Sequence, residues 1–175
     1  MVNWADISPT IADIAGANSQ REQFQGRSFR TAIEQESPAG WDEVYSSHTF
    51  HEVTMYQPMR VFRGRRYKLI WNIVHGQELS LPRDIEESST WQSIEGKGLE
   101  RIGRREGRAL LKRPEFELYD LENDPHETEN LAAEDSHKEL LTELTGKIRK
   151  FQESTNDPWV IAWKDHEGLA VIEKH

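Results

Sequence analysis

Cysteine is absent from this 175-residue chain, and its absence excludes disulfide bonds, thiolate metal sites and a cysteine nucleophile. Basic residues are in the minority, because 22 Lys and Arg stand against 31 Asp and Glu. The resulting formal net charge of −9 argues against general nucleic-acid binding. Apolar residues make up only 35%, and no apolar run is long enough to span a membrane. These features predict one loop-rich domain that is long enough to bury a core.

Common catalytic motifs are also missing. The sequence has no Gly-rich phosphate loop and no Gly-x-Ser-x-Gly turn, and His51-Glu52 lacks the second His of a His-Glu-x-x-His zinc motif. On an extended segment His48 and His51 would lie on opposite faces, so they do not predict a metal pair. A turn that leads into a helix accounts for residues 124–127 without a metal. The residues alone therefore predict neither a metal site nor a self-contained active site.

The stretch from His51 to Asn72 predicts a β-hairpin. Its second half alternates with the period of a strand that has one better-buried face. Gly64 is expected to supply a positive φ in the turn, and Pro58 is expected at the start of the first strand or on a sheet edge. Such a hairpin can serve a binding site or end in an ordinary surface turn. The polar residues gathered at its first half are His48, His51, Glu52, Thr54 and Arg60.

Residues 6–16 predict an amphipathic helix near the N-terminus. Asp6 or Ser8 can cap it, and Gly16 suits the position just after its end. Its apolar stripe comprises Ile7, Ile11, Ile14 and Ala15. Such a helix needs a partner to pack on, and the next strong apolar element is far along the chain. We therefore expect the chain to be a piece of a longer protein.

Shorter elements are expected on both sides of the hairpin. The polar residues 17–40 predict a loop with one helical turn, and residues 43–48 predict a strand that forms a three-stranded antiparallel meander with the hairpin. Further on, residues 79–82 are expected to end a strand, and Ser88 is expected to cap a short helix.

The C-terminal third gives the clearest helix. Residues 115–125 predict a strand followed by a turn. Ser136 and Glu139 have the spacing of a capping box, and the apolar stripe behind them predicts a helix over 136–153. The tail from residue 156 onward carries aromatic and aliphatic residues and is expected to pack back over the sheet.

Residues 101–113 concentrate positive charge, with six basic residues against one acidic residue, Glu106. This run can be a solvated face that balances the acidic remainder, or it can hold an anionic ligand. The basic residues are Arg101, Arg104, Arg105, Arg108, Lys112 and Arg113.

Several of these stretches resemble the C-terminal part of the sulfatase family. Residues 117–132, ELYDLENDPHETENLA, are similar to the family's strand-turn-helix signature. Residues 6–11, DISPTI, resemble the helix that closes its large domain, and residues 26–29, GRSF, resemble a loop that follows. Within the family, the branch that hydrolyses N-sulfated glucosamine is the most similar in residues 51–60, HEVTMYQPMR, and 157–160, DPWV.

The resemblance implies an α+β fold, the C-terminal subdomain of an alkaline-phosphatase-like sulfatase. We expect a small antiparallel sheet of about four strands packed by the C-terminal helix, plus one N-terminal helix from a larger domain. Residues 1–40 would then be the terminal helix and loop of the catalytic domain, and residues 41–175 the C-terminal subdomain.

The resemblance also implies that the reacting groups lie elsewhere. The family's nucleophile is a formylglycine made in a Cys/Ser-x-Pro-x-Arg motif, and this chain contains no such motif. Its calcium ion, held by carboxylates and an Asn, belongs to the same large domain and offsets the charge of the sulfate. The chain is therefore expected to hold no catalytic residue or cofactor of its own, and to need the missing domain as a partner. Family members are typically exported or lysosomal; no signal in this chain assigns its compartment.

The substrate expected from the resemblance is a sulfated sugar such as N-sulfoglucosamine. His51, Glu52 and Arg60 are candidates to face it, because they are suitable partners for a sulfate and for hydroxyl groups. Alternatively, Arg60 and Glu52 form a structural ion pair that anchors the hairpin. Two other functions remain open: a non-catalytic module that binds an acidic glycan or a protein through residues 101–113, and part of a related phosphate or phosphonate ester hydrolase.

Overall fold

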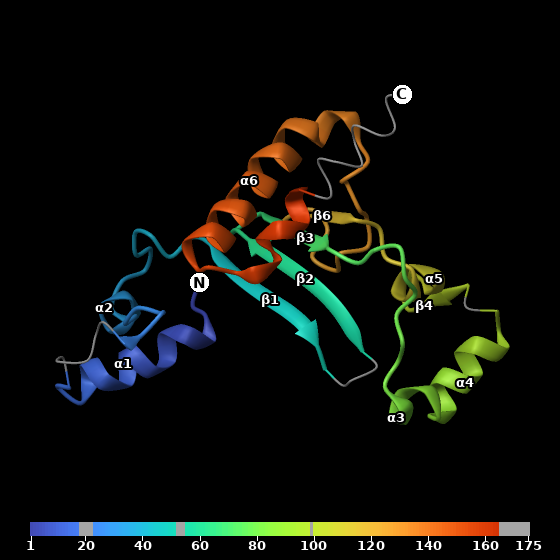
Figure 1. Cartoon of the computed structure of the whole chain (residues 1–175), viewed down its shortest axis with the longest axis horizontal. Helices are drawn as coiled ribbons and strands as arrows, with labels where there is room; N and C mark the ends of the chain where they lie inside the picture. Colours follow the sequence, from blue (N-terminus) through green and yellow to red (C-terminus); the bar gives the residue numbers. More distant parts are fainter. Residues whose placement is uncertain (18–22, 52–54, 99, 165–175) are drawn as a thin grey trace.

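The computed structural model describes residues 1–17, 23–51, 55–98 and 100–164 (Figure 1). Its centre is a four-stranded sheet in the order β1-β2-β3-β6, in which each neighbouring pair is antiparallel. The strands are β1 (Val44–Phe50), β2 (Tyr56–Arg63), β3 (Tyr67–Asn72) and β6 (Phe116–Asp120). The expected meander and the later strand are therefore confirmed, and together they form one sheet.

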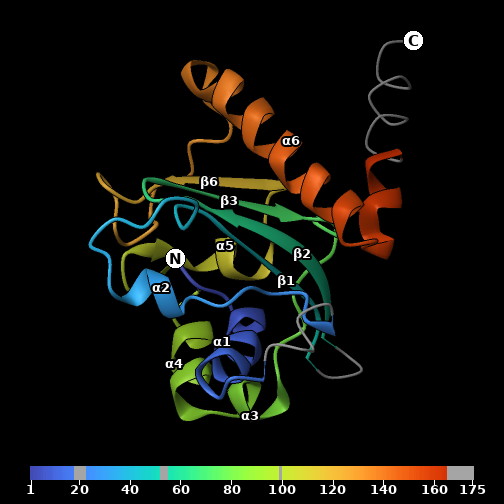
Figure 2. The same ribbon diagram turned by 90° about the vertical axis from the view of Figure 1, so that its left-hand side faces the viewer.

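One face of the sheet carries the hydrophobic core. Phe62 pairs with Leu69, and Leu69 pairs with Leu118, so these apolar side chains line up across three strands. The helix α6 (Lys138–Ser154) covers this face, as Figure 2 shows. Its residues Leu144 and Ile148 belong to the core. The stripe predicted over residues 136–153 is thus confirmed as the helix that closes the core. Within the described residues, no helix has the length and apolar content to cross a membrane.

The start of α6 differs from the expected capping box. The 3-10 turn η3 (Asp135–His137) precedes it, and His137 occupies the N-cap position without a side-chain hydrogen bond to the helix. Ser136 lies inside this turn, where its hydroxyl contacts Glu134 and the His137 ring instead of a free backbone N–H group. The predicted capping box is therefore wrong, because the extra turn moves the helix start by two residues.

The tail returns to the core, as expected. After α6, the 3-10 helix η4 (Pro158–Ile161) leads to Trp163, whose ring stacks on Trp71 with 3.8 Å between centroids. Trp163 is buried, whereas Ile161 points to solvent. The stack attaches the end of the described chain to β3.

The hairpin turn is closed without a left-handed glycine. The Gly64 N–H donates to the Tyr67 carbonyl at 2.8 Å, but Gly64 is not among the glycines with a positive φ, so that prediction is wrong. A Cβ at Gly64 would lie 3.3 Å from the Phe62 ring, and this close packing accounts for the glycine at this position. Pro58 is the third residue of β2, beside the break in the β1–β2 register between His48 and Phe50. This position near the start of the strand agrees with the prediction.

The N-terminal segment forms η1 (Trp4–Asp6) and α1 (Ile7–Ile14), followed by α2 (Arg30–Ile33) in the polar region. Gly16 has a φ of 73°, as suits a residue after a helix end. Neither Asp6 nor Ser8 caps α1 through its side chain. The Asp6 carboxylate instead accepts hydrogen bonds from the Asn3 and Arg27 N–H groups. It thereby joins the start of the chain to the loop at Arg27.

The apolar stripe of α1 is not packed against the rest of the described chain as a core helix would be. Ile11 and Ile14 are 62% and 63% exposed, and the residues of α1 that are buried are Pro9 and Thr10. The segment is attached to the sheet by polar contacts, including a 2.7 Å hydrogen bond from the Asn3 amide to the Tyr45 carbonyl. The predicted helix is therefore confirmed, while three residues of its stripe are exposed and only Ile7 is half-buried.

Residues 73–98 and 100–113 form small elements beside the sheet face opposite α6 (Figure 2). They are α3 (Arg83–Glu86), α4 (Ser89–Gly96), β4 (Arg101–Ile102), β5 (Arg105–Glu106) and α5 (Gly107–Leu111). Ser88 caps α4 as predicted, since its hydroxyl accepts from the Trp91 N–H at 3.1 Å. Residues 79–82 lie in no strand, so the strand end predicted there is wrong; Leu79 makes one backbone hydrogen bond to Leu111.

Candidate functional site

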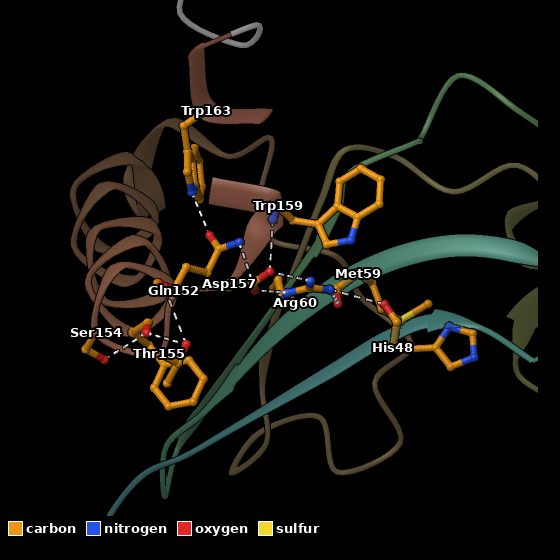
Figure 3. Close-up of polar contacts among 10 residues, drawn as sticks. His48, Met59, Arg60, Gln152, Ser154, Thr155, Asp157, Trp159 and Trp163 are labelled. Atoms are coloured by element: carbon orange, nitrogen blue, oxygen red, sulfur yellow. Dashed lines mark hydrogen bonds and ion pairs between the residues drawn. The ribbon is translucent and has the colours of Figure 1, made fainter. Parts of the chain in front are cut away.

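Arg60 is held in place by a carboxylate from the other end of the chain. Its Nε and Nη2 atoms donate to the two oxygens of Asp157, the Nη2 bond being 2.8 Å long (Figure 3). The Nη1 atom donates to the carbonyls of His48, at 3.2 Å, and Met59, at 2.8 Å. Four of the five guanidinium N–H donors are thus used inside the protein.

The network extends from Asp157 into the core. The Gln152 amide donates to Asp157 at 3.2 Å, and the Trp163 indole donates to the Gln152 carbonyl oxygen at 2.7 Å. The Trp159 N–H also donates to Asp157, which caps η4. Figure 3 shows these side chains joined between α6, the tail and β2. The network therefore connects the sheet to the C-terminal segment with its buried polar atoms satisfied.

The environment keeps Asp157 ionised. Burial alone would raise the pKa of its carboxyl group, but the hydrogen bond and charge of Arg60, with the donors of Trp159 and Gln152, outweigh burial and lower that pKa. Because both partners are largely buried, with side-chain exposures of 6% and 12%, the pair is screened much less than a surface pair. Its evident role is to position β2 against the tail.

The two predicted site residues that the structure describes, His51 and Arg60, lie in different surroundings. His51 is exposed just after β1, and its N–H donates to the Met55 carbonyl at 3.3 Å. Arg60 is buried in the network above, while Glu52 lies outside the described residues. The ion pair considered between Arg60 and Glu52 therefore stays a prediction, and the ion pair that the structure describes joins Arg60 to Asp157. His48 directs its Nδ1 atom to the Gln57 carbonyl at 3.1 Å, and Figure 3 shows its ring pointing away from Arg60.

Aromatic side chains accompany His51 at this end of the sheet. Phe50 and Tyr56 are register partners across the break between β1 and β2, and they are 65% and 43% exposed. The Tyr56 ring lies 5.8 Å from the ring of Trp159, which is itself held through Asp157. Exposed aromatic rings beside an imidazole suit recognition of a ligand more than chemistry upon it.

Nothing in the described part of the chain forms a metal centre, because no group of three or more His, Asp or Glu side chains there could hold an ion. Asp124 and Glu127 have other roles, and His126 is exposed. Asp124 accepts from the Thr128 and Glu129 N–H groups, and Glu127 forms an ion pair with Lys68 at 2.7 Å.

Asp157 and Gln152 are the site-forming residues that sequence reasoning did not find. Asp157 is 97 positions from Arg60, and nothing in local spacing links them. The one available signal was the Asp-Pro-Trp stretch itself, since Asp before Pro is a common start of a helical turn.

Comparison with known proteins gives a consistent set of relatives. No family model matches the chain. The human N-sulphoglucosamine sulphohydrolase is 34% identical over 172 residues, which cover 92% of this chain and 34% of that protein. An ulvan-active sulfatase from Formosa agariphila is 28% identical over 160 residues, covering 90% of this chain and 30% of that protein. The chain thus spans about a third of the curated relatives it matches.

A solved structure with a similar fold was determined in complex with its substrate, D-glucosamine-2-N,6-O-disulfate. It matches with a TM-score of 0.56 and 22% identity over 87% of this chain and 24% of that chain. This likeness concerns the fold, and it agrees with the α+β architecture expected from the sequence.

Proposed function

We propose that this chain, which is related to the sulfatases, forms the C-terminal subdomain of a sulfatase that removes sulfate from a sulfated glucosamine. The observation that carries the proposal is the 34% identity to the human N-sulphoglucosamine sulphohydrolase along 92% of the chain. Residues 1–40 would belong with the catalytic domain, and residues 41–175 would form the subdomain.

In this role the chain contributes substrate recognition. The nucleophile and the calcium ligands of the family would lie in the two thirds of the protein that the chain does not span. The exposed end of the β1–β2 hairpin would form a wall of the pocket, with His51 and Glu52 toward the sugar. Phe50 and Tyr56 offer ring faces for the apolar side of a pyranose. Arg60 would act through its contacts with Asp157, which fix the hairpin.

The test compares the complete product of the coding region that contains this chain with the 175-residue chain alone. We expect the complete product to release sulfate from N-sulfoglucosamine and the chain alone to release none. Sulfate release by the chain alone, or a complete product that leaves N-sulfated and O-sulfated glucosamine intact, would contradict the proposal.

A further inference from the structure

A cavity of about 460 Å³ lies on the sheet face opposite α6. Its floor is formed by β3 and β6, and its walls by β5, α5 and the loop at residues 127–130. Arg60 shares a face with its register partner Trp71, whereas Lys68 and Ile70 point the other way into this cavity. The volume is within the range of small-ligand sites, roughly 300 to 1,000 Å³.

Two of the six basic residues in 101–113 line this cavity. Arg105 and Arg113 line it, while the other four basic residues do not contribute to its walls. Arg105 is engaged, since its Nη2 atom donates to the His126 carbonyl at 3.2 Å and lies 3.6 Å from Glu127. Arg113 is half-buried and forms no ion pair or hydrogen bond within the described part of the chain.

The three acidic residues that line the cavity differ in how many partners their carboxylates have. Both oxygens of Glu117 are engaged, because one accepts from the Asn72 amide at 2.7 Å and the other from the Tyr119 hydroxyl at 2.6 Å. Glu127 is shared by two cations, Lys68 and Arg105. Glu106 lines the wall with no salt bridge or side-chain hydrogen bond among the described residues, and it lies beyond ion-pair distance of Arg113. One unused cation and one unused carboxylate therefore face the same space.

The rest of the lining consists of a buried tyrosine, aliphatic side chains and a residue held by ion pairs. Tyr119 is buried, and burial, with the hydrogen bond to the Glu117 carboxylate, raises the pKa of its hydroxyl group so that it stays neutral. Ile70, Ile102 and Leu110 add aliphatic walls. Glu127 adopts a φ of 54°, an uncommon conformation for a residue with a side chain, and its two ion pairs hold it there.

We propose that this cavity binds an acidic sugar unit, with its sulfate or carboxylate on Arg113 and its hydroxyl groups donating to Glu106. A guanidinium without a partner favours an anion, and a free carboxylate favours hydroxyl donors and repels a bare anion. A sugar that carries one acidic group supplies both, and its C–H faces suit the aliphatic walls. The site is separate from the hairpin end used in the proposed function, and it requires only that the chain be folded.

The experiment is calorimetric titration of the 175-residue chain with glucose 6-sulfate at low ionic strength. We expect saturable binding that weakens with added salt. Arg113→Gln should weaken binding about tenfold or more, as loss of a charge-assisted contact does. The control is Lys112→Gln, which removes the same charge from the neighbouring exposed residue outside the cavity and should bind like the parent chain.

Two further ligands separate the contribution of the anion from that of the hydroxyl groups. Neutral glucose should bind more weakly than glucose 6-sulfate because it lacks the anion, and inorganic sulfate should bind more weakly because it lacks hydroxyl donors for Glu106. Equal binding of inorganic sulfate, equal losses in the two variants, or no binding of glucose 6-sulfate would each overturn the proposal. Because no sulfate is released in this assay, its failure leaves the result of the sulfatase test unchanged.

Discussion

Arg60 and Asp157 illustrate what a sequence reveals about a single residue and what it does not. The place of Arg60 in the first strand of the hairpin was predictable, because strand and turn signals are local properties of the sequence. Its partner was not, because an ion pair between residues 97 positions apart depends on how α6 returns the tail to β2. His51 lies exposed at the predicted end of the sheet, so its assignment to the substrate stays a prediction, and Glu52 lies outside the described residues.

Replacing Asp157 by Asn should destabilise the chain by about 3 to 5 kcal/mol, because it leaves the buried Arg60 charge without compensation. Urea unfolding followed by circular dichroism measures the change. The matched control is Asp42→Asn, which removes an exposed carboxylate paired with Arg65 and should cost less than about 1 kcal/mol. Equal effects of the two variants would contradict a special role for the Arg60–Asp157 pair.

The same pair predicts how stability depends on pH. The pKa of Asp157 is lower in the folded than in the unfolded chain, so its contribution is complete above the unfolded value of about 4. It is lost as the pH falls through the lower, folded value, since the unfolded chain then binds the proton first. The urea midpoint of the parent chain should therefore decline below about pH 4, and that of Asp157→Asn should decline less. Parallel curves would show that Asp157 does not contribute to the acid sensitivity.

At the scale of elements, α1 and α6 carry similar apolar stripes with opposite outcomes. Both helices were predictable, because periodicity is written into consecutive residues. Which stripe is buried was not, because burial depends on a partner surface: α6 meets the sheet, and α1 meets solvent. The errors at Gly64 and at the start of α6 have a related cause. Turn geometry there is set by packing on Phe62 and by an added 3-10 turn.

Two helical isoleucines test this difference directly. Ile148 of α6 is 1% exposed, and Ile148→Ala should destabilise the chain by about 2 to 5 kcal/mol through lost contacts and a cavity. Ile11 of α1 is exposed, and Ile11→Ala should change the stability by no more than about 0.5 kcal/mol. Denaturant unfolding of both variants measures these values, and a comparable loss in Ile11→Ala would mean that α1 is packed in solution.

At the scale of the whole molecule, several exposed apolar residues lie in the N-terminal segment. Trp4 is 85% exposed, and Ile11, Ile14 and Ile33 are also open to solvent. Under the proposed function, the sulfatase domain that the chain does not span would cover this surface. We therefore expect Ile11→Ala to cost about 2 kcal/mol in the complete product, although it is neutral in the chain alone. Thermal unfolding of the complete variant is the measurement, and an unchanged stability would exclude Ile11 from the domain interface.

The central claim, that the hairpin end recognises the sugar of a sulfatase substrate, is tested most directly by the kcat/KM of His51→Ala in the complete product. With N-sulfoglucosamine we expect a decrease of about ten- to a hundredfold, the loss of a hydrogen bond to a charged group. His126→Ala, at the exposed turn near the opposite end of the sheet, should leave kcat/KM unchanged. If His51→Ala instead retains the kcat/KM of the parent enzyme, His51 does not contact the substrate and the recognition role of this end is wrong.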